Sequence, residues 1–371
     1  MPVVSQNGDD METSSKEQSN MDSLTIDAPS FFSAIQLANS ILPRELNLMH
    51  AQAVVFSEEV ATSGKVGEFI VPIVRYRQLR FNVLVAVSKG TAQELVENFS
   101  PYTGSNISRT IKGIIKKDTN IGYYLTSTLH DFYDCLKSTY HQPILLYTAI
   151  NKGENFIESS ENENNGFSIS GNFYAGDIPK KGGSNLEFLG LAVFEGDTMV
   201  GKLSGHQTSL FSMVKGNLKK TVYTIKDPQE PDLVIPISTA LKSPPVIKVS
   251  FDGLKPIINA KIDLEGNIIS IQSRINYEDP KIKSVIEDAL SQFILTELEK
   301  VFYKTLEWNC DIFQFGHIAV RNFRTIDEWE KYNWNNNYKN SQISANVNVE
   351  IVRTGKMLDS SPIIMSGEKN D

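Results

Sequence analysis

Apolar residues spaced three and four apart predict an early helix, and two buried runs that lead into helical patterns follow it. The helix covers residues 30–42, with Ser30 placed to cap its first turn and Pro43 placed to stop it. Its apolar face consists of Phe31, Ile35, Ala38 and Leu42. Residues 50–61 and 79–98 each read as a buried strand followed by a helix start. This alternation predicts a small α/β domain over residues 23–100.

The ranges around this domain differ in composition. Residues 101–150 carry two helical apolar faces and predict a smaller, largely helical middle region. Residues 151–166, rich in Glu and Asn, bury too little apolar surface to fold and predict a linker. By the same argument residues 1–22 are expected to be a mobile polar segment, and residues 357–371 a frayed tail.

Residues 167–356 predict a C-terminal domain built on an antiparallel sheet. A hairpin is expected around Glu195, Gly196 and Asp197. Four more strands are expected over residues 233–239, 244–251, 256–264 and 267–278, with Glu265, Gly266 and Asn267 as a second turn. Asp279 and Pro280 are expected to open a long helix of about 27 residues that packs on the sheet. A last strand over residues 342–355 alternates apolar and polar positions, which predicts one buried face.

Charge and composition exclude several classes of protein. The 371 residues include 36 Lys and Arg against 44 Asp and Glu, and the net charge of −8 disfavours nucleic-acid binding. The longest apolar runs are of strand length, well short of the roughly 20 residues of a membrane-spanning helix. Cys135 and Cys310, without a CxxC motif or a nearby His set, predict buried free thiols and neither a disulfide framework nor a zinc site.

The sequence offers few groups for catalysis. His130 and Asp134 share one helical face, but two ligands are too few for a metal, and Asp131 points about 100° away from His130. Ser204, His206 and Ser209 lie close in sequence without a GxSxG elbow or a recognisable acid. Residues 176–184, GDIPKKGGS, lack the order of a phosphate-binding loop. We therefore predict no catalytic, cofactor-binding or metal-binding residues, no cofactor, and no enzymatic activity.

Two surface features remain open to alternative interpretations. Arg75, Arg77 and Arg80 form a local basic patch, which is either a solvated edge or a docking site for an acidic partner or a lipid headgroup. Four aromatic residues near the C-terminus are either an exposed binding surface or a buried clamp between the last strand and the long helix. These residues are Trp329, Tyr332, Trp334 and Tyr338.

Several blocks of the sequence resemble the Ger(x)C family of spore germination proteins. The block EFLGLAVFEGDTMVGKLSG resembles one family signature, and DIFQFGHIAVRNFRTIDEWEKYNW with the closing VEIVRTG resembles another. In the N-terminal half, SILPRELNLMHAQAVVFSEEVA and LRFNVLVAVSKGTAQELVE resemble family segments in the same order. The resemblance covers residues 23–356.

The resemblance implies a three-domain α/β (α+β) lipoprotein that is the C subunit of a spore nutrient-germinant receptor. It also implies that the partners are the integral-membrane A and B subunits, and that a lipid anchor holds the protein at the spore inner membrane. The resemblance assigns no ligand-binding residue. The alternative function is a small-molecule protein that binds the germinant itself, and a hydrolase using Ser204 and His206 is a third hypothesis.

The start of the chain departs from the family pattern. Family members begin with a signal peptide, a lipobox cysteine and a strand-forming segment, and residues 1–22 match none of these. We therefore expect a truncated start or a defective copy, without an anchor and soluble as written. The first strands of the N-terminal domain are expected to be missing, which leaves a sheet edge open.

Overall fold

The computed structural model describes residues 2–5, 22–98, 107–153, 155–156, 169–273, 275–277, 279 and 281–353. The chain divides into two compact units, which are described separately. The N-terminal unit comprises residues 1–118, 123–163 and 173–205, and the C-terminal unit comprises residues 119–122, 164–172 and 206–371. The predicted frayed tail lies outside the described residues, as does most of the predicted linker.

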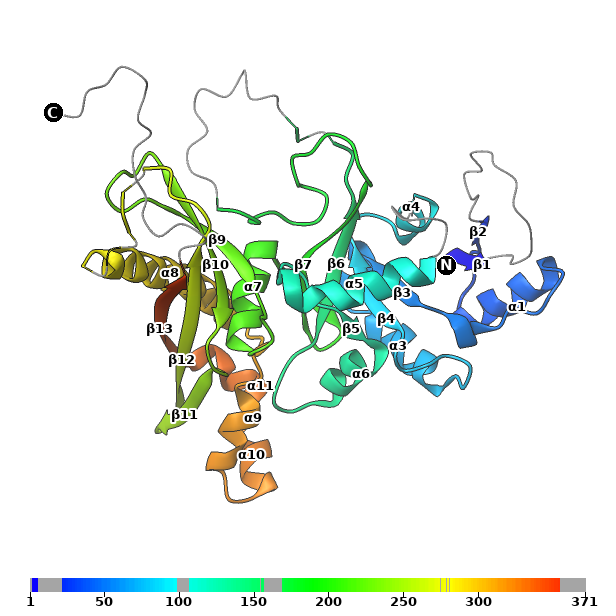
Figure 1. The fold of residues 1–371 in the computed structure, drawn as a ribbon. Helices are drawn as coiled ribbons and strands as arrows, with labels where there is room; N and C mark the ends of the chain where they lie inside the picture. The colour runs from blue at the N-terminus through cyan, green and yellow to red at the C-terminus, as the bar shows by residue number, and fades with distance from the viewer. Residues whose placement is uncertain are drawn as a thin grey trace, which may run out of the picture. The chain divides into compact units, whose positions relative to one another are not determined.

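The N-terminal unit is built on a six-stranded sheet with the order β3-β4-β6-β7-β8, in which β5 also pairs with β4 (Figure 1). Strands β3, β4 and β6 run parallel, whereas β7 and β8 continue the sheet in antiparallel fashion. The strands span Ala53–Ser57 (β3), Leu84–Ser88 (β4), Ser127–Thr128 (β5), Ile144–Ile150 (β6), Leu186–Glu195 (β7) and Thr198–Leu203 (β8). Before this sheet, β1 (Pro2–Ser5) and β2 (Asp22–Thr25) form a separate antiparallel pair, so the described ends of the predicted mobile segment are strands.

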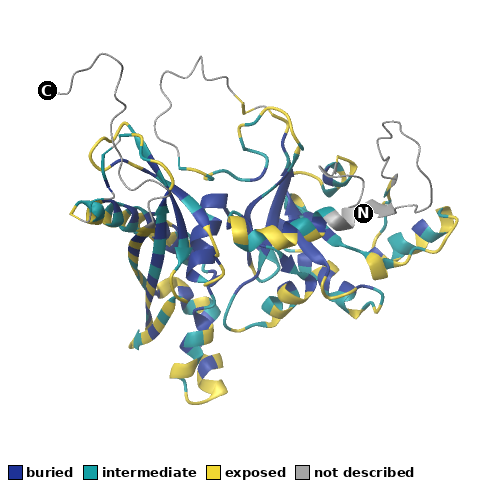
Figure 2. Cartoon of the chain, viewed as in Figure 1, coloured by how far each residue is buried: buried dark blue, intermediate teal, exposed yellow. Residues whose placement is uncertain are grey.

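Helices cover both faces of this sheet, and its central strands are buried (Figure 2). One core contains Val85, Leu145 and Phe194 together with apolar residues of α2, α3 and α6. A second core joins Leu84, Ala86 and Leu146 to residues of α5. The helices span Phe31–Ile41 (α1), Glu58–Thr62 (α2), Val66–Arg75 (α3), Ala92–Glu97 (α4), Ile107–Ile121 (α5) and Leu129–Lys137 (α6). A sheet with both faces covered explains why β4 reads as a continuous apolar run.

The early elements agree with the local signals of the sequence. The Ser30 side chain accepts a hydrogen bond from the Ser33 N–H and caps α1. The two strand-helix units appear as β3 with α2 and β4 with α4. The predicted hairpin is present as β7 and β8, but these strands complete the sheet of the N-terminal unit rather than the C-terminal sheet. The predicted domain ranges stay a prediction.

The C-terminal unit has a five-stranded sheet with the order β11-β12-β10-β9, and β13 pairs with β12. These strands span Thr221–Lys226 (β9), Val234–Leu241 (β10), Val246–Asp252 (β11), Lys255–Ile268 (β12) and Gln342–Arg353 (β13). The long helix α8 (Lys283–Glu307) packs a buried stripe against the sheet. Around it lie α7 (Gly205–Val214), α9 (Gly316–Ala319), α10 (Ile326–Tyr332) and α11 (Trp334–Asn337), with short 3-10 turns at Val320–Asn322 and Tyr338–Asn340.

Three predictions for the C-terminal unit need correction. The sheet is mainly antiparallel as expected, but β12 and β13 pair in parallel. No turn interrupts the chain at Gly266, because β12 runs continuously through it. A Cβ on Gly266 would lie 2.5 Å from the Ile351 Cδ1 atom, so the glycine serves close packing. Helix α8 begins at Lys283. Before it, Asp279 forms a turn in which its carboxylate accepts from the Lys281 N–H and its carbonyl accepts from the Ile282 N–H.

None of the helices in the described ranges has the length and the apolar content needed to cross a bilayer.

The strand order places buried glycine and carboxylate residues at specific points of the two sheets. Gly190, in the middle of β7, is the clearest of these. Its φ is +88°, and a Cβ built on it would lie 2.3 Å from the Leu203 carbonyl oxygen of β8. Its N–H donates to the Tyr123 carbonyl at 2.9 Å, where the pairing with β6 shifts register.

Replacing Gly190 with alanine is expected to lower the free energy of unfolding by roughly 2–4 kcal/mol, because both the positive φ and the backbone contact oppose a Cβ. The measurement is urea unfolding followed by circular dichroism. Gly196→Ala is the matched control: its φ is +58°, and no described atom lies within 4 Å of the position that a Cβ would take. This control should cost only about 1 kcal/mol. Equal losses in the two variants would show that the contact with Leu203 is unimportant.

Candidate functional site

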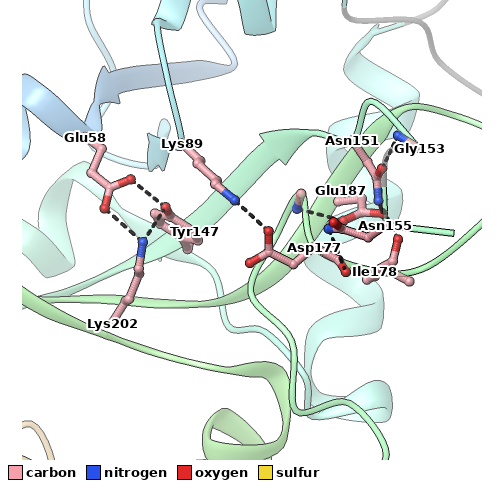
Figure 3. Close-up of polar contacts among 11 residues, drawn as sticks. Glu58, Lys89, Tyr147, Asn151, Gly153, Asn155, Asp177, Ile178, Glu187 and Lys202 are labelled. Carbon is pink, nitrogen blue, oxygen red and sulfur yellow. Dashed lines mark hydrogen bonds and ion pairs between the residues drawn. The ribbon is translucent and has the colours of Figure 1, made fainter. Parts of the chain in front are cut away.

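Several charged side chains of the N-terminal unit lie at the carboxyl edge of its sheet. Parallel strands end together at this edge, and ligands of open α/β sheets bind at such edges. Glu58 follows β3, Lys89 follows β4 and Asn151 follows β6. We call this set of side chains, with Tyr147, Asp177, Glu187 and Lys202, the carboxyl-edge network. Figure 3 shows that it forms separate groups of contacts.

The first group joins Glu58, Tyr147 and Lys202. The Tyr147 hydroxyl donates to Glu58 Oε2 at 2.6 Å, and the Lys202 ammonium lies 3.0 Å from Glu58 Oε1 and 3.1 Å from the Tyr147 oxygen (Figure 3). The ammonium also lies 5.0 Å from the centre of the Tyr147 ring. Burial and the hydrogen bond to Glu58 raise the pKa of Tyr147 well above its ordinary value. The phenol is therefore neutral at physiological pH and holds the carboxylate rather than acting as a base.

The second group surrounds Glu187, whose side chain is buried at the start of β7. Its Oε1 accepts from the Asn151 amide at 2.7 Å and pairs with the Lys180 ammonium at 2.9 Å. Its Oε2 accepts from the Gly176 N–H at 2.7 Å. A buried carboxylate is stable only when it is paired and hydrogen-bonded in this way. The group therefore ties residues 176–180 to the edge of the sheet.

A hollow of about 530 Å³ lies beside this group. Its lining is mostly polar and consists of Asn151, Lys152, Gly153, Phe156, Lys180, Lys181, Gly182 and Asn185. Two of its lysines are already paired, Lys152 with Glu94 at 3.3 Å and Lys180 with Glu187. Residues 176–184, rejected above as a phosphate-binding loop, form part of this wall as a segment without helix or strand.

In the C-terminal unit the carboxylate of Asp311 is fully buried and holds an aromatic cluster. It accepts from the N–H groups of Phe315 and Gly316 at 3.1 and 2.7 Å, and from the Trp334 indole at 3.0 Å. Burial raises the pKa of Asp311 to about 6, although these three hydrogen bonds and the charge of Lys215 favour the carboxylate. Asp311 therefore fixes the segment after α8 to the helices that precede β13.

The aromatic residues predicted as either a surface or a clamp are buried: Trp329, Tyr332, Trp334 and Tyr338. The hydroxyls of Tyr338 and Thr305 lie 2.9 Å apart, which joins the segment before β13 to α8. The burial expected for a clamp is confirmed, and Tyr338 makes the contact with α8, whereas Trp329 and Tyr332 pack against Phe323. Of the two thiols, both free, Cys310 is buried as expected, whereas Cys135 is only half-buried.

The residues considered for catalysis do not form a site. Asp131 completes a capping box with Thr128 at the start of α6, and His130 and Asp134 are exposed. Ser204 lies in the N-terminal unit, whereas His206 and Ser209 lie in the C-terminal unit, and Ser209 donates to the backbone carbonyl of His206. Over the described ranges, no three His, Cys, Asp or Glu residues are arranged to hold a metal.

His206 is buried among aromatic rings and one carboxylate. Its ring packs edge-on against Tyr223 and near Phe293, and its Nε2 lies 3.6 Å from Glu297 Oε2. Burial lowers the pKa of His206 to about 4, and the attraction of Glu297 only partly offsets this effect. The histidine is therefore a neutral core residue at physiological pH.

Sequence reasoning did not identify Glu187 or Asp311. Each is a single acidic residue inside an apolar run, LEFLGLAVF for Glu187 and CDIFQF for Asp311. A single charge among apolar residues was the sequence feature that could have indicated a buried carboxylate. A charge in such a run must be either exposed or paired. Only the structure shows that the partners come from Asn151, Gly176 and Lys180 in one case and from Trp334 in the other.

Two family models match this chain, and a solved structure shares its fold. Residues 1–150 match the spore germination protein N-terminal domain, and residues 189–355 match the C-terminal domain described as spore germination B3/GerAC like. The crystal structure of the GerBC protein aligns with a TM-score of 0.55 over 95% of this chain and 97% of that chain, at 12% identity.

Spore germination protein GerQC from Bacillus cereus is 25% identical over 181 residues, which are 48% of this chain and 48% of that protein. The match thus spans about half the length of this curated relative. The fold defines an α+β protein of two sheet-based units. The chain belongs to the Ger(x)C family of spore germination proteins.

Glu187→Gln is expected to lower the free energy of unfolding by roughly 2–4 kcal/mol. Lys180 loses its counter-charge, and the new side-chain NH2 group faces N–H donors from which the carboxylate oxygens now accept hydrogen bonds. Limited proteolysis within residues 169–185 should become faster. The control is Asp177→Asn, which removes the more exposed ion pair with Lys89 at 2.6 Å. It should cost at most about 1 kcal/mol. Similar losses in both variants would refute the structural role of Glu187.

His206→Phe is expected to reduce the decrease in the free energy of unfolding between pH 7 and pH 4. The histidine titrates near 6.5 when unfolded and about 4 when folded, so it contributes stability above pH 6.5 that is lost as the pH falls toward 4. The wild type should therefore lose roughly 3 kcal/mol more than the variant between pH 7 and pH 4. Urea unfolding at several pH values measures this difference. Parallel profiles would mean that folding does not lower the pKa of His206.

Proposed function

We propose that this chain is a non-enzymatic subunit of a spore nutrient-germinant receptor and acts in germination through protein–protein contacts at the spore inner membrane. The observation that carries the proposal is the match of both halves of the chain to germination-protein models, in order, over residues 1–150 and 189–355. The partners in this proposal are integral-membrane A and B subunits, and a lipid anchor holds the protein to the membrane.

The chemistry of the buried charged groups supports a role without catalysis. Tyr147, Glu187 and Asp311 are each engaged by neighbouring protein groups, so each is committed to holding the fold. A catalytic acid or base needs access to a substrate and a pKa near the working pH. Glu187 and Asp311 are buried, and the pKa of Tyr147 is raised far above that range.

Direct binding of the germinant, the alternative function, gains no specific support from the hollow beside Asn151. Small-molecule sites are mostly apolar, with a few polar groups that orient the ligand. This hollow is mostly polar, and its Lys152 and Lys180 already pair with carboxylates. The alternative therefore stays a prediction.

The test is complementation in a spore former that lacks its own C subunit. The chain, fused to a leader and a lipid-attachment cysteine, is expected to restore nutrient-triggered release of dipicolinic acid and to co-purify with the A and B subunits. Tyr147→Phe and His206→Phe should germinate at nearly the wild-type rate, whereas removing a catalytic acid or base costs roughly 100-fold or more.

Immunoblots of spore membranes control for the amount of each variant. Rescue in spores that lack the A and B subunits would contradict the proposed assembly. A hundredfold loss in Tyr147→Phe, at equal protein level and equal co-purification, would contradict the absence of catalysis.

A further inference from the structure

Three arginines that have no partner among the described residues follow one another closely on the surface of the N-terminal unit. Helix α3 ends at Arg75, and the loop after it contains Arg77 and Arg80; we call residues 75–80 the arginine loop. All three side chains are exposed, and none forms an ion pair or hydrogen bond with another described residue. The lysines of the carboxyl-edge network differ, since Lys89 and Lys202 each contact a carboxylate. The arginine loop therefore offers its full positive charge to an external group.

The same loop borders an apolar hollow between α1 and α3. This hollow has a volume of about 340 Å³ and is lined by Phe32, Val71, Pro72, Arg75 and Tyr76. The rings of Phe32 and Tyr76 meet edge-on at 5.1 Å, and Phe32 remains 39% exposed. Among the described residues that line the hollow, Arg75 alone is charged. The chemistry that fits is an apolar chain next to an anionic group.

The rest of the loop extends this combination of charge and apolar surface. Backbone hydrogen bonds from Leu79 to Tyr76 and from Val83 to Arg80 form two successive turns, which keep the loop short. Six residues span at most about 20 Å, so the three arginines belong to one region of the surface. Phe81, directly after Arg80, is 49% exposed. Arginines among exposed aromatic rings are typical of surfaces that rest in the headgroup region of a bilayer.

We propose that the arginine loop and the hollow beside it bind anionic phospholipids at a bilayer surface. The guanidinium groups contact the headgroup phosphates, and the hollow receives the upper part of an acyl chain. An acidic protein would match the charge but leave the apolar hollow unfilled. Because the chain carries a net charge of −8, it has no overall attraction to an anionic membrane, so binding requires a local positive region such as this loop. The proposal rests on the membrane location in the proposed function.

The experiment is co-sedimentation of the purified chain with vesicles. One set contains phosphatidylcholine alone and the other contains phosphatidylglycerol at about 30 mol%, each in low and high salt. The wild type should bind the anionic vesicles, bind neutral ones weakly, and dissociate as salt rises. Each arginine near the surface raises the membrane partition coefficient roughly fivefold. Replacing all three, as Arg75→Gln, Arg77→Gln and Arg80→Gln, should therefore reduce partitioning about 100-fold.

The control combines Lys112→Gln, Lys116→Gln and Lys117→Gln, which removes the same charge from exposed positions of α5. It should bind within a few-fold of the wild type, and circular dichroism checks the fold of both triple variants. Equal losses in both would mean that net charge alone governs binding, and equal binding to both lipid mixtures would exclude recognition of the anion. Arginine-dependent capture by immobilised polyglutamate without vesicle binding would assign the loop to an acidic protein. Each of these results overturns the proposal.

This test is independent of germination, since it uses the purified chain and vesicles alone. Failed complementation with intact vesicle binding would refute the proposed function and leave the lipid site standing. Successful complementation with no binding to anionic vesicles would refute the lipid site alone.

Discussion

The burial of single carboxylates is the constraint on which both units depend. Moving a carboxylate out of water costs several kcal/mol, and only a full set of charge-assisted hydrogen bonds offsets that cost. Glu187 meets this requirement with donors from the distant Asn151 and from Gly176 and Lys180 in the segment that precedes it. Asp311 meets it with two backbone N–H groups and the Trp334 indole. In each unit, a segment without regular structure is therefore fixed by one charge.

The features that could be predicted from the sequence depend on neighbouring residues. Ser30 caps α1 because its hydroxyl reaches an N–H three residues away. The two-residue connection at Gly196 and Asp197 forms because glycine adopts a positive φ without strain. The burial of the aromatic cluster was one of two interpretations left open by the sequence, and the size of the side chains favours it. Local geometry and side-chain size are sufficient for such predictions.

The features that could not be predicted depend on partners distant in the sequence. Gly266 looks like a turn residue, yet it lies within β12 because Ile351 and Ile237 need the space that a side chain would fill. Helix α7 has no amphipathic pattern, because nearly all of it is buried. Its hydroxyl groups bond to the backbone of the helix itself, as the Ser212 hydroxyl donates to the Thr208 carbonyl. The sequence predicts β7 and β8 in the C-terminal sheet, and this prediction is wrong. Composition cannot show that β6 pairs with β7 across the intervening residues 151–185.

Two of the blocks that resemble the family contain a residue whose presence packing explains, independently of any chemistry performed by the protein. Gly190 stands in LEFLGLAVF because no Cβ fits against the Leu203 carbonyl, and Asp311 opens DIFQFG because it holds Trp334. Residues required by packing identify a fold, whereas recognition depends on surface residues that packing leaves free to vary. The unpaired charges of the arginine loop belong to this second kind, because the described part of the fold makes no use of them. What the protein recognises is therefore to be sought on its surface and not in its motifs.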